Sequence, residues 1–287
     1  MMLFTPYPQL INHPIETKSR YNNKTNNKTN NKTNNKTNNK TNNKTNNKTN
    51  NKTNNKTNNR VRHPMDIKSA IILITSASSM LGSTLAVHFA HLGAKIILCD
   101  QDKFGLMETF ARCKAISQDV HYYHTPDYSL ETIHRLFDFI DQTYHGAPDV
   151  LVNNWPNASL PPLIGEQRAE VFLQKLAMMA STLFTFGQAS AERMRINNKP
   201  GVIVNVISQN DEYDLAGIEN ANSMVSGFTQ SWAKELTPFN IRVGGVVPSA
   251  KGDVDEKPHW AELQDELIRN TEYIVANEYF SGRVMSA

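Results

Sequence analysis

The sequence predicts a three-layer α/β protein in which a parallel, doubly wound sheet lies between two layers of helices. A disordered N-terminal tail is expected to precede this folded part. Three observations predict this fold. A four-residue repeat fills the beginning of the chain, short apolar runs rich in β-branched residues follow it, and helical patterns separate those runs. Apolar runs without polar alternation are typical of strands buried on both faces, and their alternation with helices is typical of a parallel sheet.

Residues 1–64 are expected to form a disordered, low-complexity tail. From Asn22 to Thr57 the motif Asn-Asn-Lys-Thr occurs nine times without interruption. These residues bury too little apolar area to offset the entropy lost when a backbone becomes ordered. One interpretation is that the tail binds anionic surfaces weakly, since spaced lysines attract phosphate without specificity. We favour the other, in which the tail is an expanded repeat or an over-long start and Met65 is the working initiator.

The basic charge of the chain belongs to this tail. Residues 1–64 carry thirteen Lys and Arg and one acid, so residues 65–287 have a net charge of −9 although the whole chain has +3. A nucleic-acid partner inferred from the whole-chain charge would therefore be an error, and we expect no specific one.

Residues 65–287 are predicted to form a single domain. Strands are expected at 70–75, 95–99, 120–124, 149–154, 201–207 and 241–247, with a short last strand within 281–287. Helices are expected at 81–92, 103–115, 129–144, 166–195, 218–237 and 259–276. Parallel sheets of this kind bind ligands at the carboxyl ends of their strands, near the point where the strand order reverses.

Neither a membrane span nor a metal site is expected. No run approaches the roughly 18 apolar residues that a spanning helix needs, and the first residues lack the apolar core of a signal peptide. Cys99 and Cys113 have no metal-ligand partners nearby and are expected to be buried, reduced thiols. His121 and His124 fall on opposite faces of a predicted strand. Together these features favour a cytoplasmic protein.

The turn after the first predicted strand carries the first of several motifs that resemble the short-chain dehydrogenase/reductase family. The family's T-G-x-x-x-G-[IL]-G is matched at Thr75, Leu81 and Gly82, whereas Ser76 and Met80 replace two of its glycines. The resemblance continues in order through "DVLVNN", "GVIVNVIS", "SGFTQSWAKEL", "IRVGGVVP" and "YFSGRV". It implies a Rossmann-type fold and an NAD or NADP cofactor with its pyrophosphate at this turn. Because Met80 is bulky where phosphates would approach, we expect its side chain to pack under the helix instead.

The resemblance assigns further cofactor contacts. Asp100 ends the second strand, where the family's acid accepts the ribose hydroxyls of NAD and repels the extra phosphate of NADP; a solvated turn aspartate is an equally good interpretation. Asp127 matches the residue that approaches the adenine, although helix capping is the favoured role. Asn153 begins the loop that lies against the dinucleotide. Trp155 replaces a small residue of that loop and either fills the cofactor groove, which we favour, or stacks on a flat ligand.

The family's four catalytic positions are only partly matched. The resemblance places Ser208 at the serine that orients the substrate carbonyl. It places Ile218 at the tyrosine that transfers the proton, Asn222 at the lysine that lowers the pKa of that tyrosine, and Met179 at the asparagine that anchors a relay water. A phenol with a pKa near 10 needs a neighbouring cation to work at neutral pH, and an isoleucine transfers no proton.

A rearranged proton donor is the alternative. Tyr213 lies five residues before Ile218, and Lys251 lies in the loop after the sixth predicted strand. The acidic neighbours Glu212 and Asp214 would raise the pKa of the Tyr213 phenol rather than lower it. We therefore do not favour a site built from Ser208, Tyr213 and Lys251.

Two function hypotheses follow. The favoured one is a non-catalytic or much altered family member that retains weak NAD binding and forms homo- or hetero-oligomers through its helices at 166–195 and 218–237, which in the family pack against a second subunit. A groove filled by the protein itself would leave no cofactor site. The alternative is an active NAD(P)-dependent oxidoreductase with a rearranged donor. A small-molecule substrate is doubtful, because Tyr279 follows Pro248 by only 31 positions, and this segment is shorter than the family's usual substrate cover.

Overall fold

The computed structural model describes residues 65–156, 160–161, 169–208, 215–249 and 260–287. The predicted disordered tail lies outside these residues. The expected strands and helices are all found in the described part, and the predicted fold class is confirmed.

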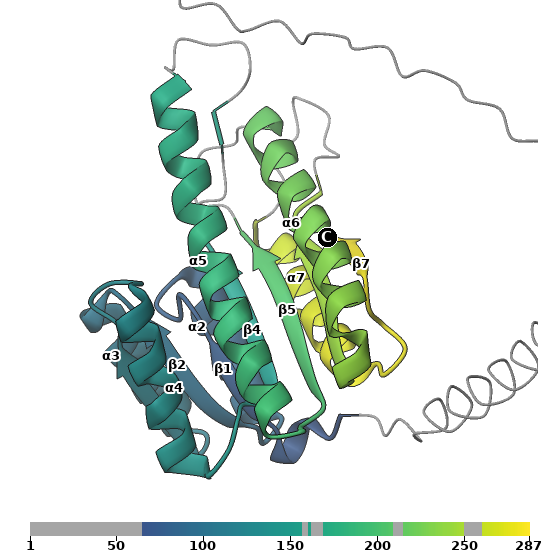
Figure 1. The fold of residues 1–287 in the computed structure, drawn as a ribbon. Helices are drawn as coiled ribbons and strands as arrows, with labels where there is room; N and C mark the ends of the chain where they lie inside the picture. Colours follow the sequence, from purple (N-terminus) through teal and green to yellow (C-terminus); the bar gives the residue numbers. More distant parts are fainter. Residues whose placement is uncertain (1–64, 157–159, 162–168, 209–214, 250–259) are drawn as a thin grey trace, which may run out of the picture. The chain divides into compact units, whose positions relative to one another are not determined.

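The described residues form one seven-stranded sheet in which each strand runs parallel to its neighbours (Figure 1). Its order is β3-β2-β1-β4-β5-β6-β7. The strands are β1 (Ile71–Ile74), β2 (Lys95–Asp100), β3 (Val120–His124), β4 (Val150–Trp155), β5 (Gly201–Ile207), β6 (Ile241–Val247) and β7 (Arg283–Ser286). The chain builds the sheet outward from β1 to β3 and then returns to the other side of β1. The strand order therefore reverses between β1 and β4, where a doubly wound sheet has its ligand crevice.

Two layers of helices cover the sheet. Buried side chains of α2 (Met80–His91), α3 (Lys103–Lys114) and α7 (Trp260–Ala276) share one core cluster. Those of α4 (Leu130–Tyr144), α5 (Ala169–Ile196) and α6 (Leu215–Leu236) share another on the opposite face. Two short 3-10 turns complete the elements, η1 (Ile67–Ser69) and η2 (Thr237–Phe239).

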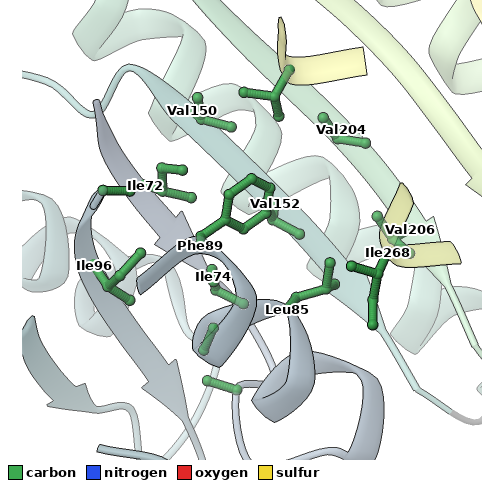
Figure 2. Close-up of a cluster of buried hydrophobic side chains, with 14 of the residues drawn as sticks. Ile72, Ile74, Leu85, Phe89, Ile96, Val150, Val152, Val204, Val206 and Ile268 are labelled. Atoms are coloured by element: carbon green, nitrogen blue, oxygen red, sulfur yellow. The ribbon is translucent and has the colours of Figure 1, made fainter. Parts of the chain in front are cut away.

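The strand residues alternate between these two cores. In β4, Val150 and Val152 belong to the cluster on the α2 face, and Leu151 belongs to the cluster on the α5 face. Figure 2 shows Val150 and Val152 beside Phe89 and Leu85 of α2. A strand with large apolar residues on both faces cannot face water on either, which explains the continuous apolar runs in the sequence.

Polar side chains fix where the helices begin. The hydroxyl of Ser79 accepts from the Gly82 N–H at the start of α2, and the hydroxyl of Ser129 accepts from the Thr132 N–H at the start of α4. The first N–H groups of a helix have no partner within it, so such caps stabilise the ends by about 1 kcal/mol each.

Candidate functional site

The carboxyl ends of β1 and β4 are tied together at the point where the strand order reverses. The Asn154 N–H donates to Thr75 Oγ1 at 2.9 Å, and that hydroxyl donates to the Asn154 carbonyl at 3.2 Å. Both residues are buried, with 2% of each exposed. Thr75 therefore holds the two strands at a fixed spacing and contributes its hydroxyl to the frame of the site.

The turn from β1 into α2 keeps the shape of a glycine turn without its first glycine. Ser76 has φ +47°, in the left-handed region that glycine adopts most easily. Its carbonyl accepts from the Ser79 hydroxyl at 2.7 Å and from Asn154 Nδ2 at 3.3 Å. These bonds offset the strain of a non-glycine residue in that conformation.

Gly82 is the glycine of the turn that cannot be replaced without rearrangement. A Cβ built on Gly82 would collide with the Ser76 carbonyl oxygen and lie 2.9 Å from Ser79 Oγ. The Leu81 side chain points into the core on the α2 face, so only its backbone is available to a ligand.

The sequence-based expectation for Met80 was wrong. Its side chain does not pack under α2 but is 47% exposed at the first residue of the helix. Met80 is the first residue of α2, directly after the capping Ser79, and the next residue, Leu81, is the one whose side chain enters the core.

Asp100 is buried at the end of β2, with 7% exposed. Its Oδ2 accepts from the Ser78 N–H at 2.8 Å and from the Ser78 hydroxyl at 2.7 Å, and its Oδ1 accepts from the Asp102 N–H at 3.0 Å. The carboxylate thus connects the end of β2 to the turn after β1. Burial raises the pKa of the neighbouring Cys99 thiol, and the charge of Asp100 raises it further.

Asp127 is exposed and supports the start of α4 without capping it directly. Its Oδ1 accepts from the N–H and the hydroxyl of Ser129, and Ser129 in turn caps the helix. Hydrogen bonds from Ser129, first of all from its hydroxyl, hold the pKa of Asp127 below its usual value.

Asn153 does not join the turn. Its Nδ2 donates to the Leu183 carbonyl of α5 at 2.9 Å and to Asn205 Oδ1 of β5 at 3.1 Å. The neighbouring Asn154 reaches the turn instead, where its Nδ2 donates to Ser79 Oγ at 3.0 Å. Strand alternation would have identified Asn154, because it shares a face with Val150 and Val152, next to α2.

Ser208 lies just beyond β5 with 3% exposed, and its N–H donates to the Trp155 carbonyl at 3.1 Å. Trp155 is partly buried and packs against a third apolar cluster formed by Met179, Leu183, Ile207, Ala221, Val225 and Val247. At least part of its indole ring therefore serves internal packing.

The residues that the resemblance aligns with the proton donor and its relay lie in the interior. Ile218 in α6 is 2% exposed, and Met179 in α5 is 1% exposed within the third cluster. Asn222, one turn after Ile218, donates from Nδ2 to the Pro248 carbonyl at 3.1 Å, and its Oδ1 is buried without a hydrogen-bond partner in the described part.

Tyr213 and Lys251 lie outside the described residues. Among the residues that are described, no group of three or more His, Cys, Asp and Glu side chains is arranged to hold a metal ion. None of the described helices is both long and apolar enough to cross a membrane.

The geometry of the turn is compatible with the phosphates of a dinucleotide. The left-handed Ser76, the close approach at Gly82 and the start of α2 reproduce a helix N-terminus at the end of a parallel strand, which favours an anion. The buried Oδ1 of Asn154 has no hydrogen-bond partner among the described groups, but as an acceptor it suits a donor such as a hydroxyl or water and not a phosphate oxygen. Thr75, Ser76 and Gly82 would hold the group, with Asn154 beside them.

Comparison with known proteins gives consistent matches. A family model described as short chain dehydrogenase matches residues 70–256. The chain is 30% identical over 187 residues to a 3-oxoacyl-[acyl-carrier-protein] reductase of Thermotoga maritima, covering 64% of this chain and 75% of the relative. It is 25% identical over 198 residues to a sorbitol-6-phosphate 2-dehydrogenase of Klebsiella pneumoniae, covering 64% and 70%.

Solved structures share the fold. A short-chain type dehydrogenase/reductase from Mycobacterium marinum superposes with a TM-score of 0.65 at 20% identity, covering 77% of this chain and 94% of that one. An NAD+-bound xylitol dehydrogenase superposes with a TM-score of 0.65 at 17% identity, covering 77% and 98%. At these identities the structures support the fold alone.

Proposed function

Because the chain belongs to the short-chain dehydrogenase/reductase family, whose model matches residues 70–256, we propose that it is a member that binds an NAD-type dinucleotide but lacks the family's proton-transfer chemistry. The observation that carries the proposal is Ile218. The resemblance aligns it with the catalytic tyrosine, and its side chain is 2% exposed and has no ionisable group.

Two further residues support this proposal. Met179 is apolar and buried where the family has an asparagine for a relay water. Asn222 stands at the lysine and directs its Nδ2 to the Pro248 carbonyl, so it supplies no positive charge beside Ser208. A phenol placed at 218 would therefore find no ammonium group at position 222 to lower its pKa.

The proposed ligand is NAD or NADH rather than the NADP pair. Asp100 is an acid at the end of β2, where it would repel a 2′-phosphate. When bound, a nicotinamide dinucleotide supplies hydride transfer, and the protein supplies its position. The proposal includes a cytoplasmic protein, since both cysteines are buried and unpaired.

The same proposal includes oligomers formed through α5 and α6, which lie side by side on one face of the sheet (Figure 1). On their outer face Met178 and Phe184 are 54% and 47% exposed. A groove of about 310 Å³ beside Phe184 has Trp232 in its lining, with Glu192, Glu235 and Arg195 also lining it. Acids and a base on one patch can pair across a two-fold axis, so a second copy of this chain or of a relative is a suitable partner.

An active oxidoreductase with a rearranged donor is the second candidate. The retained turn geometry at Ser76 and Gly82, together with Ser208 at the end of β5, favours it. In that case Ser208 would orient a substrate carbonyl.

A nucleotide titration tests the proposal. NADH and NADPH are added to the full chain, and the change in nucleotide fluorescence is followed together with turnover of carbonyl substrates. We expect NADH to bind, NADPH to bind more weakly, and no turnover. Absence of NADH binding at millimolar concentration would contradict the proposal, and turnover that Ser208→Ala abolishes would favour the second candidate.

A further inference from the structure

The carboxylate of Asp100 is already occupied by the protein. An ionised carboxylate has about four lone-pair directions in which it accepts hydrogen bonds. Three are used, by the Ser78 N–H, the Ser78 hydroxyl and the Asp102 N–H. An adenosine ribose that presents two neighbouring hydroxyls therefore finds room for one of them at most.

Of the three donors, the Ser78 hydroxyl is the one that a ligand can replace. The two N–H groups belong to the backbone of the turn and of the loop before α3, and their removal would require those segments to move. The hydroxyl needs only a rotation about the Ser78 χ1 bond. Chemically it is also the same donor as a ribose hydroxyl, and it approaches the same Oδ2 oxygen at 2.7 Å.

The Ser78 side chain is seated against α3. A Cβ built on Gly105 would lie 2.7 Å from the Ser78 Cβ and 2.7 Å from Asp102 Oδ2. Glycine at this first turn of α3 thus makes the space in which the Ser78 side chain lies next to Asp100. Three elements therefore position the contact between Ser78 and Asp100: the turn after β1, the end of β2 and the start of α3.

We propose that Ser78 gates ribose recognition: its hydroxyl takes the place of a ribose hydroxyl on Asp100 Oδ2, and a nucleotide must displace it to reach the carboxylate. The gate rests on the proposed nucleotide binding at the turn. It assigns Ser78 as a specificity-determining residue and predicts that nucleotide binds to this turn weakly. The affinity of the full chain for NADH is set by competition within the protein as well as by contacts with the ligand.

The test compares hydroxyl removal at two adjacent positions. In Ser78→Ala a ligand no longer has to break a hydrogen bond to the charged carboxylate of Asp100. This variant is therefore expected to bind NADH about tenfold more tightly than the wild-type chain. Ser78→Thr keeps the hydroxyl and is expected to bind like the wild type. Ser79→Ala removes a hydroxyl that caps α2 and is expected to bind no more tightly. Inorganic pyrophosphate, which has no ribose, should compete with equal affinity in the wild type and in Ser78→Ala.

The outcomes separate the two proposals. Wild-type NADH binding that Ser78→Ala leaves unchanged or weakens overturns the gate and leaves the proposed function standing. Absence of NADH binding in both the wild type and Ser78→Ala overturns the proposed function and the gate with it. Hydrogen exchange in the nucleotide-free chain adds an independent measurement, because the Ser78 N–H also donates to Asp100 Oδ2. The Ser78 amide should exchange faster in Asp100→Ala, and an unchanged rate would contradict this bond and with it the position of Ser78 beside Asp100 on which the gate depends.

Discussion

Gly82 and the Ser76 carbonyl approach each other so closely that no side chain fits between them. A Cβ at Gly82 would collide with the Ser76 carbonyl oxygen, which is backbone and cannot rotate away. Gly82→Ala is therefore expected to push the turn away from α2, to destabilise the protein by about 1–3 kcal/mol and to remove NADH binding. Urea denaturation and an NADH titration measure the two effects.

Gly227 provides the matched control, since it is a glycine within a helix whose Cβ would meet nothing within 4 Å. Gly227→Ala in α6 should stabilise the protein by about 0.5–1 kcal/mol, because alanine loses less backbone entropy than glycine. If both variants changed stability equally, crowding at Gly82 would not be the cause.

Thr75 is expected to matter through its hydroxyl rather than its volume. Thr75→Val keeps the shape but leaves the buried N–H of Asn154 without the acceptor at 2.9 Å. The free energy of unfolding should fall by about 1–3 kcal/mol, the usual cost of an unsatisfied buried donor. Thr84→Val is the control, since Thr84 Oγ1 bonds an exposed carbonyl of its own helix, that of Met80. A loss no larger than that of Thr84→Val would mean that the Thr75–Asn154 bonds contribute little.

The sequence predicted the sheet and helices well because both depend on repeated local patterns. The run that becomes β1 is apolar at every position, and those that become β4 and β5 are apolar apart from Asn153, Asn154 and Asn205. Parallel strands covered on both faces need this composition. The site could be predicted only as a set of positions. Whether an acid such as Asp100 faces a ligand or the turn depends on the Ser78 rotamer and on the space above Gly105, and neither leaves a pattern in the sequence.

Asn153 and Asn154 show the same limit in a smaller form. Both asparagines belong to one motif, yet one bonds Leu183 and Asn205 on the α5 face and the other bonds Ser76 and Ser79 on the α2 face. Family resemblance aligns the pair as a unit, whereas strand alternation separates them.

Stability is expected to fall at alkaline pH because of buried phenols. Burial, and then the charge of Asp119, raises the pKa of Tyr144 from 10.0 to about 12, and burial also raises the pKa of Tyr128. Between the unfolded and folded pKa values the folded chain retains a proton that the unfolded chain has lost. The stabilising contribution is therefore complete below about pH 10 and decreases as the pH rises toward 12.

Tyr144→Phe isolates this effect. The Tyr144 hydroxyl is buried without a hydrogen-bond partner in the described part, so its removal should cost little at pH 8. Urea denaturation across the alkaline range should show a shallower decline for Tyr144→Phe than for the wild type. Tyr279→Phe, whose side chain is 73% exposed, should leave the decline unchanged, and a decline as steep in Tyr144→Phe as in the wild type would contradict the assignment.

The outer face of α5 offers the most direct test of the proposed oligomer. Met178 and Phe184 are large, apolar and half exposed, and Phe184 contacts Trp232 edge to face with ring centroids 6.2 Å apart. A charge placed on this face would be buried without a partner if a second subunit covers it. Met178→Glu combined with Phe184→Glu is therefore expected to convert the oligomer to monomers, which sedimentation velocity at micromolar concentration measures. Phe104→Glu on α3 is the control, because Phe104 is 88% exposed and lies on the opposite helix layer. An oligomer that survives the double change, or that Phe104→Glu disrupts equally, would place the interface elsewhere, and a wild-type chain that is already monomeric would remove the oligomer from the proposal.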